Sequence, residues 1–125
     1  MANPNIINVT TLTGNTTYLT PANTTANTLL SNAASSGLVF KINQIVCANV
    51  NGSSAVNATV AINNQAAGAG TNYPIISTIS VPASASVIAV DKTTAVYLME
   101  NQSIVVTSGT SSGITYTISY ESIQS

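Results

Sequence analysis

Apolar and polar residues alternate through the stretch from Gly37 to Asn63, and this pattern predicts β-strands. In the first half the apolar positions are the even-numbered Leu38, Phe40, Ile42, Val46, Ala48 and Val50. In the second half they are Val56, Ala58, Val60 and Ile62. A period of two places alternate side chains on one face, so each half is expected to bury one face. We expect the two strands to form a hairpin around Asn51-Gly52.

The apolar faces of this hairpin also predict how its strands pair. A two-residue turn at Asn51-Gly52 would pair Val50 with Ser53 and put the two apolar sets on opposite faces. A loop with an odd number of residues would pair Val50 with Ser54 and put both sets on one face. We therefore expect a loop of three or five residues. Gln44 interrupts the apolar face and is interpreted as a bulge or a sheet-edge position.

Turn signals divide the rest of the chain into short strands. Residues 1–12 are expected to form a short strand or an extended arm, and Gly14-Asn15 and Asp91-Lys92-Thr93-Thr94 are expected to be turns. Residues 21–36 are interpreted as loop with one short strand, and 65–72 as a flexible connection. The run 87–90 is wholly apolar and is interpreted as a strand covered on both sides, or as a crossover inside a sandwich. Further strands are expected at 16–20, 75–81, 95–99, 103–107 and 114–121. The last of these alternates most regularly, with apolar or aromatic residues at Ile114, Tyr116, Ile118 and Tyr120.

About eight short strands in 125 residues predict one all-β domain. Regularly spaced turn signals are typical of a two-sheet antiparallel β-sandwich, for which a jelly roll is one arrangement. Residues 1–12 are the expected N-terminal arm of this single domain, and such an arm can add a strand to a neighbouring subunit.

Charge is the unusual feature of the composition. Charged residues make up 4% of the chain, where about 25% is typical. There are two Lys or Arg residues, three acids and no histidine, for a net charge of −1. Such a chain lacks the basic groups that bind nucleic acid or an anionic membrane. A nearly uncharged surface has little repulsion between copies, which favours dense, ordered assembly.

The ends and the single cysteine indicate where the protein is made. The sequence has no run of about 18 apolar residues, so no membrane span is predicted. The segment MANPNII does not resemble a signal peptide. One cysteine, Cys47, excludes an internal disulfide and fits synthesis in a reducing cytoplasm.

Little catalytic chemistry can be built from these residues. Histidine, the common general base, is missing from the sequence. Cys47 is expected to be a half-buried structural thiol in mid-strand, on the face opposite Ile42. The acids Asp91, Glu100 and Glu121 are expected to be solvated surface groups. No catalytic residue, cofactor or metal site is predicted.

The aromatic residues offer the candidates for binding contacts. Phe40, Tyr116 and Tyr120 lie at apolar positions and are expected in the core. Tyr18 and Tyr73 lie outside the apolar pattern and are candidate contact residues. In the expected arm, Ile6 and Ile7 are candidates too.

Three stretches carry a resemblance to a known class of protein: KINQIVCANVNGSSAVNATVAINN (41–64), VYLMENQSIVV (96–106) and YTISYESI (116–123). Together with VPA (81–83), they resemble small virion proteins of tailed bacteriophages, especially marine and cyanobacterial phages. The resemblance covers about two-thirds of the chain, from Gly37 onward. It implies a β-sandwich subunit that decorates or cements the capsid, or belongs to the neck, tail or fibres. It carries over no catalytic residue.

These observations support one main hypothesis for the function and several alternatives. The first is a non-enzymatic capsid decoration or cement protein on the virion surface, made in the host cytoplasm. Its expected partners are the major capsid protein or other virion proteins, and copies of itself in a homo-oligomer, with a trimer favoured. The alternative is a neck, tail or fibre module that binds a host receptor or glycan. A hydrolase using Glu100 or Glu121 ranks far behind, and a bacterial surface-layer or pilus subunit is a further option.

Overall fold

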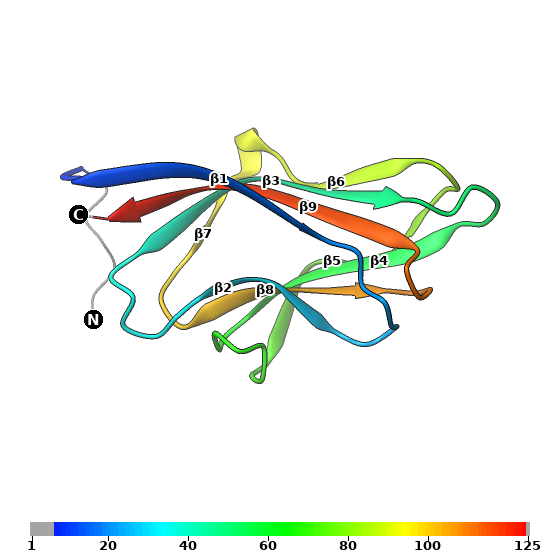
Figure 1. The fold of residues 1–125 in the computed structure, drawn as a ribbon, viewed down its shortest axis with the longest axis horizontal. Helices are drawn as coiled ribbons and strands as arrows, with labels where there is room; N and C mark the ends of the chain where they lie inside the picture. Colours follow the sequence, from blue (N-terminus) through cyan, green and yellow to red (C-terminus); the bar gives the residue numbers. More distant parts are fainter. Residues whose placement is uncertain (1–6, 125) are drawn as a thin grey trace.

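The computed structural model describes residues 7–124, which form two antiparallel β-sheets packed face to face (Figure 1). The nine strands of the described residues are β1 (Thr11–Leu19), β2 (Asn27–Asn32), β3 (Val39–Asn49), β4 (Val56–Asn63), β5 (Asn72–Val81), β6 (Ser86–Val90), β7 (Val96–Leu98), β8 (Gln102–Ser108) and β9 (Ile114–Gln124). A short 3-10 turn, η1 (Lys92–Thr94), joins β6 to β7 where the sequence predicted a turn. The prediction of an all-β, two-sheet antiparallel sandwich is confirmed.

The strands pair in a nested order. In sheet A the order is β1-β9-β3-β6, and β7 also pairs with β3. In sheet B the order is β2-β8-β4-β5. The first strand thus pairs with the last, the second with β8, the third with β6 and β7, and the fourth with the fifth. The chain therefore runs outward from β1 to β4, turns back at the β4–β5 connection, and returns from β5 to β9 alongside its own first half. The paired strands are divided between two sheets that face each other.

The hairpin predicted around Asn51-Gly52 is wrong. β3 lies in sheet A with β9 on one edge and β6 and β7 on the other, so no edge is left for β4. β4 lies in sheet B, between β5 and β8. Residues 50–55 cross from one sheet to the other, so neither predicted register exists. Two strands show the same alternation of apolar residues whether they pair in one sheet or face each other across the core. Alternation alone therefore could not show that β3 and β4 belong to different sheets.

A bulge in β3 changes which of its residues are buried. Ile42 is opposite Tyr120 and Gln44 is opposite Ser119, so Asn43 is an extra residue in the ladder. The bulge interpretation of Gln44 is confirmed. After an inserted residue the alternation reverses. Ile45 and Cys47 therefore lie in the core, although the sequence predicted them on the opposite face from Ile42.

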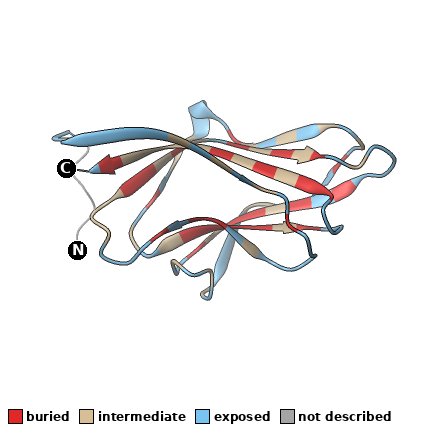
Figure 2. Cartoon of the chain, viewed as in Figure 1, coloured by how far each residue is buried: buried red, intermediate tan, exposed pale blue. Residues whose placement is uncertain are grey.

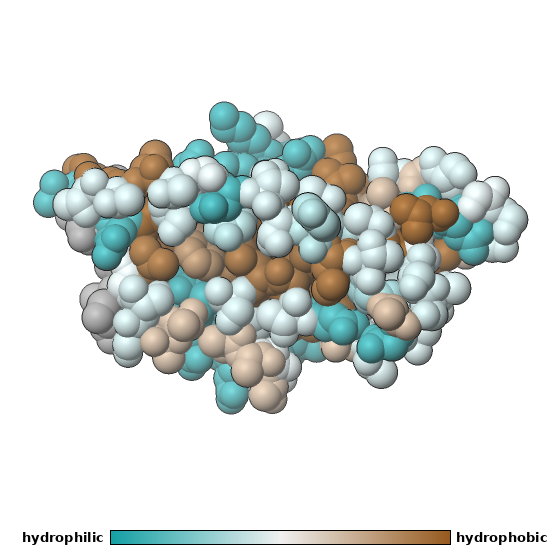
Figure 3. Space-filling model, viewed as in Figure 1, coloured by the Kyte–Doolittle hydropathy of each residue, from teal (hydrophilic) through white to brown (hydrophobic). Residues whose placement is uncertain are grey.

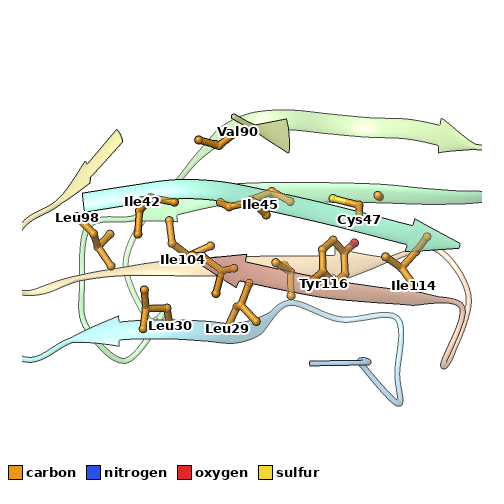
Figure 4. Close-up of a cluster of buried hydrophobic side chains, with 14 of the residues drawn as sticks. Leu29, Leu30, Ile42, Ile45, Cys47, Val90, Leu98, Ile104, Ile114 and Tyr116 are labelled. Atoms are coloured by element: carbon orange, nitrogen blue, oxygen red, sulfur yellow. The ribbon is translucent and has the colours of Figure 1, made fainter. Parts of the chain in front are cut away.

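The core forms where the inner faces of the two sheets meet (Figure 4). β9 alternates as predicted, with Ile114, Tyr116 and Ile118 fully buried, and the pattern is visible along this strand in Figure 2. Phe40 packs against Tyr120 with ring centroids 5.0 Å apart, a distance typical of favourable aromatic pairs. The three aromatics expected in the core are therefore buried or packed against it.

Two local predictions at the edges of sheet A are wrong. Gly14-Asn15 is no turn, because both residues lie within β1 and pair with β9. The apolar run 87–90 is not covered on both sides, because β6 is an edge strand with Ile88 on its exposed face. In both cases the local sequence did not show where the segment would lie in the sheet, and long-range pairing decided the outcome.

Buried polar side chains join the two sheets at several points. Asn32 in β2 donates to the carbonyl of Leu98 in β7, and Asn49 in β3 donates to that of Val81 in β5. The Tyr116 hydroxyl donates to the Thr107 carbonyl of β8. Each bond satisfies a buried donor that would otherwise cost about 1–3 kcal/mol. They therefore fix how the sheets sit on one another.

Candidate interaction surface

Among residues 7–124, no strand or loop lies over most of the outer face of sheet A. Directly paired residues share a face, so one row across this sheet runs from Tyr18 to Thr117, Val46 and Ile88. Tyr18 is 74% exposed and Ile88 is 55% exposed, while Val46 is half-buried between them. This row, which we call the apolar row, crosses β1, β9, β3 and β6, four of the five strands of the sheet.

Hydroxyl groups flank the apolar row on both sides. The Thr16 and Ser119 hydroxyls lie 3.2 Å apart, and the Thr20 and Thr115 hydroxyls 2.8 Å apart. Cross-strand hydroxyl pairs of this kind hold side chains in place on a sheet surface. They make this part of the face uncharged, and leave hydroxyl groups able to exchange further hydrogen bonds with another protein.

The charged groups of this face lie toward its other end. Lys41 in β3 is directly opposite Glu121 in β9 and Tyr97 in β7. Glu121 accepts a hydrogen bond from the side chain of Asn43, the extra residue of the bulge. One acid and one lysine thus lie side by side, and the face as a whole carries no excess charge.

By contrast, the loop of residues 64–71 covers part of the outer face of sheet B. Asn63 is fully buried and organises this loop: its Nδ2 donates to the carbonyls of Gly68 and Gly70, and its Oδ1 accepts from the backbone N–H of Gln65 and Gly70. The Ser103 hydroxyl also donates to the Gln65 carbonyl. The flexible connection predicted here is therefore a loop held by hydrogen bonds.

Glycine is needed at two positions of this loop. Gly68 has φ +74°, a conformation that side chains disfavour. At Gly70, a Cβ atom would come within 1.9 Å of the Asn64 side-chain oxygen. Because this loop occupies sheet B, sheet A offers the larger open surface.

The groups considered for catalysis have structural settings. Cys47 is fully buried, and burial raises its pKa from 9.0 to about 12, so the thiol is not an activated nucleophile. The Asp91 carboxylate caps η1, and hydrogen bonds from the side chain and backbone of Thr93, with help from Thr94, lower its pKa. Glu121 bonds to Asn43. Among residues 7–124, no three His, Cys, Asp or Glu side chains gather to hold a metal ion.

Glu100 differs from the solvated group that the sequence predicted. It lies in the turn between β7 and β8, and both of its carboxylate oxygens are buried without a hydrogen-bond partner within the described part of the chain. The side-chain Oδ1 of Asn43 is the other buried oxygen without a partner among residues 7–124. The remaining acids have partners: Asp91 accepts hydrogen bonds from Thr93 and Thr94, and Glu121 accepts one from Asn43.

The predicted contact residues do not form one cluster. Tyr18 is on β1 at one edge of sheet A, whereas Tyr73 is on β5 at the diagonally opposite edge of sheet B, 59% exposed. Ile7 is exposed, and Ile6 lies outside the described residues. Of the strand or arm expected at residues 1–12, Thr11 and Leu12 belong to β1 and pair with β9 of the same chain, whereas residues 1–6 lie outside the described part of the chain.

Sequence reasoning missed the apolar row because it assigned Val46 to the core. Recognition of Gln44 as the point where the burial face reverses would have placed Val46 outside, whereas the exposure of Ile88 follows from the edge position of β6. Comparisons of the chain with protein-family profiles, curated proteins and solved structures find no match. Across residues 7–124, no helix has the length and apolar character needed to span a membrane.

Proposed function

We propose that this protein is a non-enzymatic structural subunit of a tailed-phage virion, and that it decorates and cements the outside of the capsid. The observation that carries this proposal is the outer face of sheet A, which combines an apolar row with uncharged hydroxyl rows. A cement subunit must sit among many copies and against a capsid without repulsion, and a face of this kind permits such contacts.

The position of the resembling segments supports the same proposal. Residues 41–64, 96–106 and 116–123 include most of β3, β4, β8 and β9, the central strands of both sheets. The resemblance to phage virion proteins therefore concerns the strands that build the sandwich and its outer face. The major capsid protein is the proposed partner.

We further propose that the sandwich is a jelly roll. The nested pairing, first strand with last and inward to β4 with β5, supports this arrangement. Jelly rolls occur in viral capsid proteins and in lectins, so the fold is an analogy and the role must come from the surface. Tyr18 and Tyr73 lie on different sheets, which gives a glycan-binding platform less support than a protein contact.

The proposal is tested on virus particles that encode the protein. Mass spectrometry of gradient-purified particles should find it in many copies, and electron microscopy with a labelled antibody should place the label over the head. Label confined to the tail or its fibres would transfer the role to the neck, tail or fibre module. Absence of the protein from purified particles would overturn a virion role.

A further inference from the structure

Within residues 7–124, strand β1 leaves one edge of sheet A without a partner strand. It is nine residues long, and its sequence TLTGNTTYL has no charged residue and no proline. Its nine residues pair with β9 in one unbroken register on the other side. An unpaired edge of this length and composition can accept another strand through its backbone groups.

Each of the other sheet edges carries a feature that hinders pairing. β5 contains Pro74 and is distorted at Thr78, which has φ 51°. β2 has six residues and a register shift between Thr28 and Leu30. β6 and β7 have five and three residues and are separated by η1. Because natural sheets commonly protect their edges in these ways, the regular, unprotected β1 stands apart.

The register shows which backbone groups β1 offers. The bond from the Val50 N–H to the Gly113 carbonyl continues the β3–β9 register, so odd-numbered residues of β9 direct their backbone groups to β3. Even-numbered residues, including Gln124, therefore bond to β1, where Gln124 is opposite Thr11. The odd-numbered residues of β1 therefore direct their backbone groups to β9. Leu12, Gly14, Thr16 and Tyr18 direct their N–H and C=O groups to the free edge.

We propose that two copies of this chain pair through β1, antiparallel, about a two-fold axis at Asn15. This register is the one in which every residue of Thr11–Leu19 has a partner, because Asn15 is the middle of the strand. It places Leu12 opposite Tyr18 of the second copy, and Gly14 opposite Thr16, so that outward-directed backbone groups meet each other. Sheet A then continues from one copy into the next.

Side chains favour this same pairing. Leu12 is 58% exposed and Tyr18 74% exposed in the single chain, and both lie on the outer face of the sheet. In the pair, Leu12 of each copy lies opposite Tyr18 of the other, so the same aliphatic–aromatic contact forms on both sides of the two-fold axis. β1 carries no charge that would oppose the approach of an identical strand. An apolar band between the two sheets is visible on the side where β1 and β2 lie, which a second copy would face (Figure 3).

This inference goes beyond the virion role, since it concerns the purified protein alone. It also differs from the trimer expected from the sequence. Sedimentation velocity over a concentration series should show a reversible monomer–dimer equilibrium. A monomer at every concentration, or a trimer, would overturn the pairing.

A cysteine at the two-fold axis tests the geometry. In the proposed pair, Asn15 faces its own copy at about 4.5 Å between Cα atoms, within reach of a disulfide. Asn15→Cys should therefore form a covalent dimer in oxidised glutathione. Thr16→Cys is the matched control, since its Cα atoms would be about 8 Å apart, beyond disulfide reach. Equal cross-linking of both variants would overturn the register; the buried Cys47 is present in both.

A pair of double variants tests the register without cross-linking. Leu12→Glu with Tyr18→Lys places opposite charges across the axis, and Leu12→Glu with Tyr18→Glu places like charges there. Within one chain the two positions are about 20 Å apart, so their charges are screened from one another. We expect the like-charged variant to dissociate at least about tenfold more readily than the oppositely charged one. Equal dissociation would rule out the facing of Leu12 and Tyr18.

Discussion

The hydroxyl of Tyr116 in β9 donates a hydrogen bond to the carbonyl of Thr107 in β8, and this bond crosses the core from sheet A to sheet B. Tyr116 is fully buried, so water cannot replace its partner. A bond at this place fixes the two sheets against each other in the middle of the core, where apolar contacts alone would allow sliding.

Removing this hydroxyl should destabilise the protein. Tyr116→Phe keeps the ring but deletes the donor, and we expect the free energy of unfolding to fall by about 1–3 kcal/mol. Urea denaturation monitored by circular dichroism measures the change. Tyr97→Phe, on the exposed outer face, is the control and should change stability by less than about 0.5 kcal/mol. Equal effects of the two variants would contradict a structural role for the bond.

Alkaline pH should unfold the protein through two buried groups. Burial raises the pKa of Cys47 from 9.0 to about 12, and burial followed by the nearby Cys47 charge raises that of Tyr116 above 10.0. Both groups are neutral in the fold and ionise more readily once unfolded. Their contribution is complete below pH 9 and is lost as pH rises toward 12, by about 1.4 kcal/mol per pH unit per group.

The measurement is the urea midpoint from pH 6 to 11. With no histidine in the chain, the midpoint should change little between pH 6 and 8.5. Cys47→Ala should delay the alkaline decline by about one pH unit, since Tyr116 then begins the loss near pH 10. A decline that begins at the same pH in both proteins would show that Cys47 is not responsible.

Local features of the fold could be predicted from the sequence because their causes are local. The alternation of β9 and the Asp91 turn depend on neighbouring residues, and both were predicted. The β3–β4 hairpin was predicted wrongly because pairing partners are chosen across the whole chain: paired residues of β3 and β9 run from Asn49 with Ile114, 65 positions apart, to Val39 with Ile123, 84 positions apart. Gly14 looked like a turn because pairing with β9 is invisible in the local sequence.

The candidate surface was harder to predict than the fold. Tyr18 could be singled out because it lies outside the apolar pattern. Val46 could not, because one extra residue at Asn43 moves it from the inner to the outer face. A bulge depends on ladder geometry, and an alternating sequence shows only an interruption.

The bulge gives a direct test on two neighbouring residues. Ile45 is fully buried in the core and Val46 is half-buried on the outer face. Ile45→Thr should lower the free energy of unfolding by about 2–4 kcal/mol, because it loses apolar volume and buries a hydroxyl. Val46→Thr should change it by less than about 1 kcal/mol. The uniform alternation predicted from the sequence requires the opposite order.

Asn63 and Asn64 offer a second matched pair, this time in the loop over sheet B. Asn63→Asp replaces a buried donor with a carboxylate that faces the Gly68 and Gly70 carbonyls, and should cost about 3–5 kcal/mol at pH 7. Asn64 accepts a bond from the Thr71 N–H and is exposed, so Asn64→Asp keeps its bond and should be nearly neutral. Denaturant unfolding compares them. Equal stability would mean that Asn63 does not organise the loop.

The proposed capsid contact can be tested on the apolar row without touching β1. Ile88→Lys places a solvated cation in that row, on a residue already 55% exposed, so folding should be unaffected while affinity for capsids falls at least about tenfold. Ile79→Lys is the control, because Ile79 is also exposed, at 40%, but belongs to sheet B. Co-sedimentation with capsids that lack the protein measures binding, and circular dichroism confirms the fold. If Ile79→Lys alone weakens binding, the capsid contact lies on sheet B.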